Sequence, residues 1–470
     1  METVKDREQI EFDRSPIDYF CISGKNSDTI AVIKITRLSS EIGVYQGVCM
    51  QASNKVLLKN TIMLYVTKVS AYVFPLITFP YLTRVLMPEK YGVVTFSNAF
   101  MSYFILFVDF GFLLSSTREC ALHRNDPKKL SQIVMATIQG KLILSIVGLV
   151  ILMPLLFLVP SLQDKRLFIL LSYLTIIIKI FIPDYLFRGL ERMEIVTYRT
   201  LVGRSIYTML IFFLIRSPSD FYFIPIISSI GECVIVFATW MKLRNIVRIE
   251  YISLPIKEIF ISMRTSSIYF LSRIASTVYS SSNIIILGFL YDDSKVALFG
   301  VAHSLIKNIR GLYGPIADSL YPYMISKRNY RLIWRIIAFT FPMIMVGTIV
   351  LFLLSDKIII LFAGPKYEEA SSIFRAMLPL VVITLPLYLL GFPMLGAMGR
   401  IKDANFSVIF GALFYVVVVT VLFLVNRINF ISLAYTTGAT ESFILVYRFF
   451  CVRRGISDQQ RRVERINSDI

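Results

Sequence analysis

Residues 133–158, IVMATIQGKLILSIVGLVILMPLLFL, form a mostly apolar stretch that is long enough to cross a lipid bilayer. A spanning helix needs about 20 predominantly apolar residues, and in hydrocarbon it must satisfy its own backbone hydrogen bonds. Other stretches of this kind occur before and after it, so the sequence predicts twelve spans. They lie near residues 60–82, 93–115, 133–158, 167–187, 197–215, 221–241, 265–290, 296–322, 336–354, 374–397, 405–425 and 430–450.

The composition of the 470-residue chain agrees with an all-α, polytopic membrane protein. Hydrophobic residues make up 56% of the chain, charged residues make up 17%, and the mean hydropathy is +0.68. Soluble domains contain about 25% charged residues. These values exclude a water-soluble enzyme with one buried core, and they exclude a disordered chain.

Motifs for several other classes of function are absent from the sequence. The five cysteines show no paired spacing, and two histidines are too few for a histidine-based metal cluster. Neither a dinucleotide-binding motif nor a phosphate-binding loop occurs. We therefore expect no cofactor, no metal, no enzymatic activity and, since a bilayer explains the net charge of +18, no nucleic-acid partner.

The distribution of basic residues orients the predicted spans. One set of alternate loops carries 24 Lys and Arg residues and the other carries 10, which places both termini in the cytoplasm. The longest inside connection, 244–264, divides the chain into six-helix lobes at 55–243 and 265–450. We expect a basic cytoplasmic tail at 451–470, and a poorly ordered, dispensable extension at 1–54.

The two lobes echo each other in one short feature. The first span of each lobe is followed by an acidic turn, at residues 88–90 in one lobe and 292–295 in the other. Internal repeats of this kind are common in transporters, where the substrate site lies between the repeats. The sequence therefore predicts two lobes around a central cavity.

Eight ionisable residues lie at a similar depth within eight different predicted spans. Such groups are costly in hydrocarbon unless they face a cavity or a partner. We therefore expect them to point into a shared interior, where Lys68 and Asp109 are placed to pair. The alternative is that such pairs only hold helices together. The eight residues are Lys68, Asp109, Lys179, Arg204, Glu232, Arg273, Asp318 and Glu441.

Two helical stripes predict a cationic wall. Span eight carries Lys307 and Arg310 on one stripe, with no obvious acidic neighbour, and span seven carries Arg273 beside several hydroxyl-bearing residues. Lysine and arginine suit phosphate, whereas hydroxyl groups suit sugars. Packing of small residues between helices is the alternative explanation for span seven. The predicted substrate-binding residues are Arg273, Lys307, Arg310, Lys68 and Arg204, and the predicted ion-coupling residues are Asp109 and Glu232.

Five stretches of this sequence together resemble one transporter family. The chain is similar to the polysaccharide repeat-unit (O-antigen-type) flippases of the multidrug/oligosaccharidyl-lipid/polysaccharide exporter superfamily, from residue 57 to about residue 454. Arg84, Asp109, Arg118 and Arg273 lie within the matching stretches. The five matching stretches are LLKNTIMLYV (57–66), FPYLTRVLMPEKYGVVTF (79–96), YFILFVDFGFLLSSTRECA (103–121), PDYLFRGLERM (183–193) and YFLSRIASTVYSSSNIIILGFL (269–290).

The resemblance implies a function and a location. It implies that undecaprenyl-diphosphate-linked oligosaccharide moves across the bacterial inner membrane by alternating access, with membrane lipids, the polysaccharide polymerase and the chain-length machinery as partners. Three alternatives stay open. A drug or cation antiporter favours an acid-dominated cavity, a membrane polymerase needs a substantial outer loop, and a peptidoglycan-precursor flippase typically has fourteen spans.

Overall fold

The computed structural model describes residues 41–247 and 249–468, with side chains over 59–458 except at 248 and 272. The chain divides into two units, Met1–Leu57 and Leu58–Ile470. Most of the predicted extension, residues 1–40, lies outside the described residues. The rest of that unit is helical from Glu41 onward.

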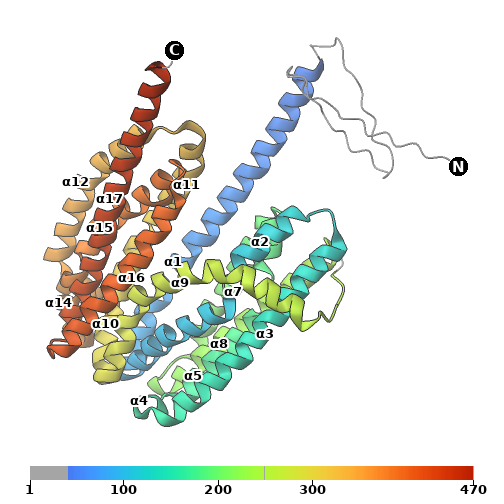
Figure 1. The fold of residues 1–470 in the computed structure, drawn as a ribbon. Helices are drawn as coiled ribbons and strands as arrows, with labels where there is room; N and C mark the ends of the chain where they lie inside the picture. The colour runs from blue at the N-terminus through green and yellow to red at the C-terminus, as the bar shows by residue number, and fades with distance from the viewer. Residues whose placement is uncertain (1–40, 248, 469–470) are drawn as a thin grey trace. The chain divides into compact units, whose positions relative to one another are not determined.

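The first half of the larger unit is built from helices that pack mainly on one another (Figure 1). Here α7 packs along α8, α5 packs on α8, and α2 packs on α6. The elements are α1 (Glu41–Asp109), α2 (Phe112–Leu122), α3 (Pro127–Leu158), α4 (Pro160–Gln163), α5 (Arg166–Lys179), α6 (Asp184–Gly189), α7 (Met193–Leu214), η1 (Pro218–Tyr222) and α8 (Phe223–Arg244).

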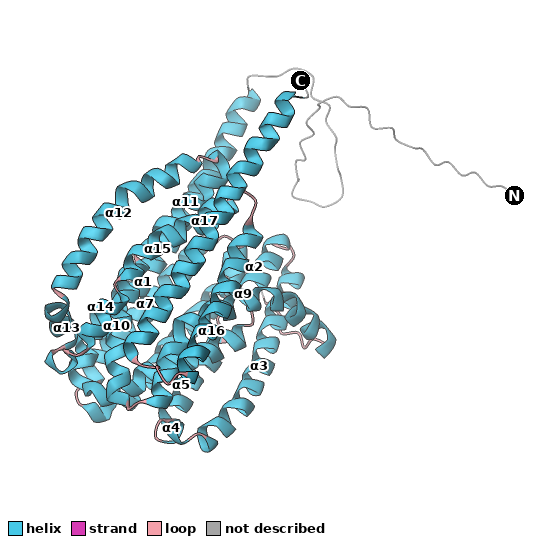
Figure 2. Ribbon diagram, turned by 60° about the vertical axis from the view of Figure 1, so that its left-hand side comes forward, coloured by secondary structure: helices cyan, strands magenta, loops and turns pink. Residues whose placement is uncertain are grey.

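The second half is also helical, and its first helix contacts both halves. Helix α9 packs on α2 and α3 and also on α10, α16 and α17. Figure 2 shows that helices alone make up the regular structure of the described residues. The elements are α9 (Ile256–Leu290), α10 (Asp293–Gly311), α11 (Tyr313–Lys327), α12 (Tyr330–Leu353), α13 (Ser355–Ala363), η2 (Pro365–Tyr367), α14 (Ala370–Met377), α15 (Pro379–Leu389), η3 (Leu390–Gly396), α16 (Ile401–Leu424) and α17 (Phe430–Ser468).

The all-α, multi-pass prediction is confirmed. Seven helical stretches in the described part of the chain are long and apolar enough to span a bilayer, and the first of them, Lys59–Leu122, contains two predicted spans. The remaining four predicted spans coincide with α7, with α9, with α10 and α11 together, and with α17. These helices carry charged side chains at span depth, which lowers their apolarity.

Three predicted spans are interrupted before they end. Span two breaks at Phe110 and Gly111, whose φ angles are 43° and 84°. Span four breaks between α5 and α6, at residues 180–183, which end in Pro183. Span eight breaks at Leu312, between α10 and α11. Irregular backbone at membrane depth is tolerated where it is buried in protein or lines a cavity. Each break lies beside ionisable residues, so the breaks mark where a polar site belongs.

The two halves meet where their acidic turns were predicted. Gly92 lies just after the acidic turn at residues 88–90. A Cβ added at Gly92 would lie 1.9 Å from the backbone oxygen of Asp293, which belongs to the acidic turn at residues 292–295. Lys165 reaches the same residue, with its Nζ 2.8 Å from Asp293 Oδ1. These contacts join α1 and the α4–α5 connection to the start of α10. The predicted orientation places them on the outer side of the membrane.

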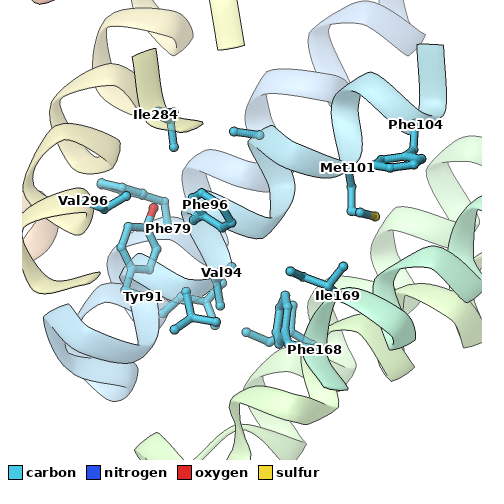
Figure 3. Close-up of a cluster of buried hydrophobic side chains, with 14 of the residues drawn as sticks. Phe79, Tyr91, Val94, Phe96, Met101, Phe104, Phe168, Ile169, Ile284 and Val296 are labelled. Atoms are coloured by element: carbon cyan, nitrogen blue, oxygen red, sulfur yellow. The ribbon is translucent and has the colours of Figure 1, made fainter. Parts of the chain in front are cut away.

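A hydrophobic cluster lies directly behind this contact. Figure 3 shows Phe79 and Phe96 of α1 beside Ile284 of α9 and Val296 of α10, with Phe168 of α5 nearby. All five side chains are buried. Close packing of this kind resists the insertion of even one methylene group. The ends of the two halves that carry the acidic turns are therefore packed tightly together in this structure.

Candidate functional site

A cavity of about 640 Å³ with many charged side chains in its lining lies among the helices of the first half. Its walls come from α1, α2, α3, α5, α6, α7 and α8, together with Arg273 of α9. Six cationic side chains and three carboxylates line it, an excess of three positive charges. They are Lys141, Lys179, Arg188, Arg199, Arg204 and Arg273, and Asp109, Asp184 and Glu232.

Asp109 lies between two of these cations. Its Oδ1 accepts a hydrogen bond from Lys141 Nζ at 2.9 Å, and its Oδ2 accepts one from Arg273 Nη1. The three residues come from α1, α3 and α9, so this cluster joins span two to the helix that contacts both halves. The expected pairing of Asp109 with Lys68 is wrong, because Lys68 pairs with Asp318 of α11.

The other two carboxylates of the cavity are paired as well. Glu232 Oε1 lies 3.1 Å from Lys179 Nζ, and Asp184 pairs with Arg199. Lys179 ends α5 and Asp184 begins α6, so the break in span four places both residues at the cavity wall. The acidic groups of the cavity are therefore held by neighbouring cations.

Two cations of the cavity have no carboxylate partner in the described residues. Arg204 Nη1 donates instead to the Ser70 hydroxyl at 2.5 Å and to the Thr67 carbonyl at 3.1 Å. Arg188 of α6 has a buried Nε that makes no hydrogen bond to any residue that the structure describes. These two guanidinium groups remain able to bind an anion.

The predicted cationic wall of span eight divides into two different environments. Arg310 Nη2 donates to Glu441 Oε1 at 2.5 Å, and Arg310 Nε donates to the Thr384 hydroxyl at 2.6 Å. The expectation that Arg310 lacks an acidic neighbour is therefore wrong. Lys307, one turn earlier, is exposed and makes no ion pair or hydrogen bond within the described part of the chain.

The structure brings together some of the predicted site residues. Arg204, Arg273, Asp109 and Glu232 line the cavity of the first half, as does Lys179. The remaining predicted residues lie outside this lining: Lys68, Lys307 and Arg310. The eight charges therefore do not share one interior. They are divided between the cavity, the exposed Lys68–Asp318 pair and the Arg310–Glu441 cluster.

Four charged residues of the cavity escaped the sequence prediction. Lys141 lies within the predicted span 133–158, and its charge in an apolar helix was a usable signal. Arg199 lies near the start of predicted span 197–215, within α7. Asp184 and Arg188 lie at the end of predicted span four, and the break at Pro183 places both beside the cavity. Only the position of the break relative to α6 could have indicated their role.

The fold of this chain is similar to that of solved membrane transporters. The chain superposes on a lipid II flippase MurJ in an inward closed conformation with a TM-score of 0.66, covering 84% of this chain and 87% of that one at 15% identity. It also superposes on an inward-facing MATE family transporter of the MOP superfamily with a TM-score of 0.62, covering 86% and 98% at 14% identity. At these identities the likeness establishes the fold.

Sequence comparison then establishes the family. Residues 57–327 match the family described as polysaccharide biosynthesis protein, so the chain belongs to that family. A protein named "Putative O-antigen transporter" from Escherichia coli (strain K12) is 28% identical over 346 residues, covering 70% of this chain and 81% of its own. Its namesake from Shigella dysenteriae is 26% identical over 322 residues, covering 68% and 81%. The resemblance described above is confirmed.

Proposed function

We propose that this protein is a flippase that moves oligosaccharides linked to a polyprenyl diphosphate across the bacterial inner membrane. The observation that carries the proposal is the cavity of the first half, where six cations face three carboxylates. A diphosphate and its sugars cannot cross hydrocarbon unaided, because desolvating their charges and hydroxyl groups is too costly. A polar, cationic cavity replaces the lost water while the polyprenyl tail stays in the lipid.

Alternating access requires that the contact between the halves opens on one side at a time. The Lys165–Asp293 ion pair and the glycine contact at Gly92 hold the predicted outer side closed. Release of a substrate to the outer leaflet would separate these groups. Coupling to an ion gradient through Asp109 or Glu232 belongs to the same proposal, since both carboxylates lie in the cavity wall.

A drug or cation antiporter is the second candidate, because the fold is also that of the MATE transporters. The charge of the cavity disfavours it. A cationic substrate would meet an excess of three positive charges, and every cavity carboxylate is already paired. Loss of the gene should therefore leave drug susceptibility unchanged while it changes surface polysaccharide.

The experiment for the proposed function is deletion of the gene, followed by analysis of lipid-linked oligosaccharide and surface polysaccharide. We expect intermediates to accumulate on the cytoplasmic side and surface polysaccharide to be lost. Expression of the full chain should restore both. Full-length surface polysaccharide in the deletion strain, with no accumulated intermediate, would overturn the proposal.

A further inference from the structure

Asp109 fills the position in the cavity where an anion would bind. Its two carboxylate oxygens accept from Lys141 and Arg273, and both Lys141 and Asp109 are largely buried, with side chains 11% and 16% exposed. Two cations brought to one point by α3 and α9 form a site for an anion with more than one oxygen. In this structure the protein's own carboxylate is that anion.

A third cation beside this cluster is not satisfied by Asp109. Arg188 lies within electrostatic range of both Asp109 and Arg273, and its Nε is buried without a hydrogen-bond partner in the described residues. A carboxylate carries one negative charge, whereas a diphosphate diester carries two and offers more acceptor oxygens. The site formed by Lys141, Arg188 and Arg273 therefore suits a diphosphate better than it suits Asp109.

The carboxylate lies directly before a break in the helix. Asp109 ends α1, and the next two residues, Phe110 and Gly111, leave the helical conformation. This break is tied to α9, because the Phe110 ring stacks on Phe270 with centroids 4.7 Å apart. A shift of Asp109 away from Arg273 would loosen one of the links between span two and α9.

We propose that Asp109 is an internal substitute for the substrate's phosphate, and that the arriving diphosphate displaces it from Lys141 and Arg273. This inference rests on the proposed function, since the diphosphate belongs to the lipid-linked substrate. Displacement replaces the link between Asp109 and α9 with links from the substrate to α3, α6 and α9. Occupation of the cavity thereby changes how span two is held, which couples binding to rearrangement of the halves.

The test is the affinity of the purified full-length protein for inorganic pyrophosphate, measured by titration calorimetry in detergent. Asp109→Asn removes the competing charge and nearly preserves shape, so it should bind pyrophosphate about tenfold or more tightly than the wild type. Glu232→Gln is the matched control, since it makes the same charge change beside Lys179 in the same cavity. Equal gains in both variants would indicate a general charge effect and overturn the proposal.

A second variant keeps the test decisive if Asp109→Asn does not fold. Arg188 makes no ion pair among the described residues, so Arg188→Gln should retain normal abundance and bind pyrophosphate about tenfold or more weakly. Unchanged affinity in Arg188→Gln, or no binding by the wild type and Asp109→Asn alike, would contradict the inference. Displacement of pyrophosphate by an equal concentration of phosphatidylglycerol would assign the site to ordinary lipid headgroups and also overturn it.

The proposed function can fail separately from this inference. Suppose that Asp109→Asn binds pyrophosphate more tightly but the wild type moves no lipid-linked oligosaccharide in vesicles. The proposed role of Asp109 as a substitute for phosphate is then supported, and the flippase assignment fails. Suppose instead that the wild type transports the substrate but binds pyrophosphate no more weakly than Asp109→Asn does. The flippase assignment is then supported, and the proposed role of Asp109 fails.

Discussion

At the scale of residues, the carboxylates inside the membrane are paired and some of the cations are not. Asp109, Glu232 and Glu441 each contact a lysine or arginine. An ionised carboxylate in a low-dielectric interior is costly unless it is paired and hydrogen-bonded. Lys307 and Arg188 have no such partner among the described residues. The uncompensated charge that remains for a ligand is therefore positive.

Lys307 and Arg310 form a matched pair for testing this difference. Arg310→Gln leaves the buried Glu441 without its cation, at a cost of about 3–5 kcal/mol, so we expect low membrane abundance. Lys307→Gln removes no ion pair or hydrogen bond among the described residues, so we expect normal membrane abundance. The measurement is membrane abundance beside polysaccharide output for both variants. Normal abundance and full output in Arg310→Gln would contradict this account.

At the scale of elements, the helices could be predicted from the sequence but their breaks could not. Apolar length predicted the positions of the helices, because a spanning segment has few alternatives to a helix in hydrocarbon. The breaks at Gly111, Pro183 and Leu312 depend on which neighbours satisfy the freed backbone groups. The ion pairs between helices could not be predicted either, since the depth of a charge in the membrane does not reveal which helix faces it. Lys68 and Asp109 lie at one depth and yet have different partners.

The closed contact between the halves predicts a large effect of one methyl group. In Gly92→Ala the new Cβ would lie 1.9 Å from the Asp293 backbone oxygen, which cannot move as a flexible side chain does. We expect the outer contact to open, so that a cysteine at Thr95 reacts with an impermeant maleimide added from outside. The Thr95 side chain is partly buried against Gly300 in the closed contact.

Gly347→Ala is the control for this experiment. Gly347 lies within α12 and has no heavy atom within 4 Å of an added Cβ. Alanine there should favour the helix by about 1 kcal/mol and leave the reactivity of the Thr95 cysteine unchanged. Equal labelling in the Gly92 and Gly347 variants would show that the outer contact does not depend on Gly92.

At the scale of the whole molecule, the helix that follows one acidic turn packs on the acidic turn of the other half. Residues 88–90 and 292–295 come from corresponding positions of the two halves, and Gly92 packs on Asp293. The orientation is predicted separately, from the unequal distribution of Lys and Arg between alternate loops. Orientation itself is a property of the membrane-inserted protein, so it stays a prediction.

Cysteine accessibility tests this orientation. In a background without the native cysteines, a cysteine at Arg124 should be protected from an impermeant reagent in intact cells, and one at Lys366 should be labelled. Both side chains are exposed in the structure, so access depends on the side of the membrane alone. Lys165 is an unsuitable reporter, because it is buried against Asp293. Labelling at Arg124 from outside would reverse the topology.

The N-terminal extension is predicted to be dispensable. Residues 1–54 contain no predicted span, and residues 1–57 separate from the remainder as a unit of their own. A chain that starts at Met50 should restore surface polysaccharide in a deletion strain to the level of the full chain. Loss of function at normal membrane abundance would show that the extension takes part in transport.

The central claim is that this protein moves lipid-linked oligosaccharide between leaflets, and transport by the purified protein tests it most directly. The full chain would be reconstituted into vesicles containing polyprenyl-diphosphate-linked oligosaccharide, and the fraction accessible to an added glycosidase would be followed over time. We predict that substrate from the inner leaflet becomes accessible in vesicles containing the protein and stays protected in empty vesicles. Equal, slow accessibility in both kinds of vesicle, with folded protein present, would contradict the account.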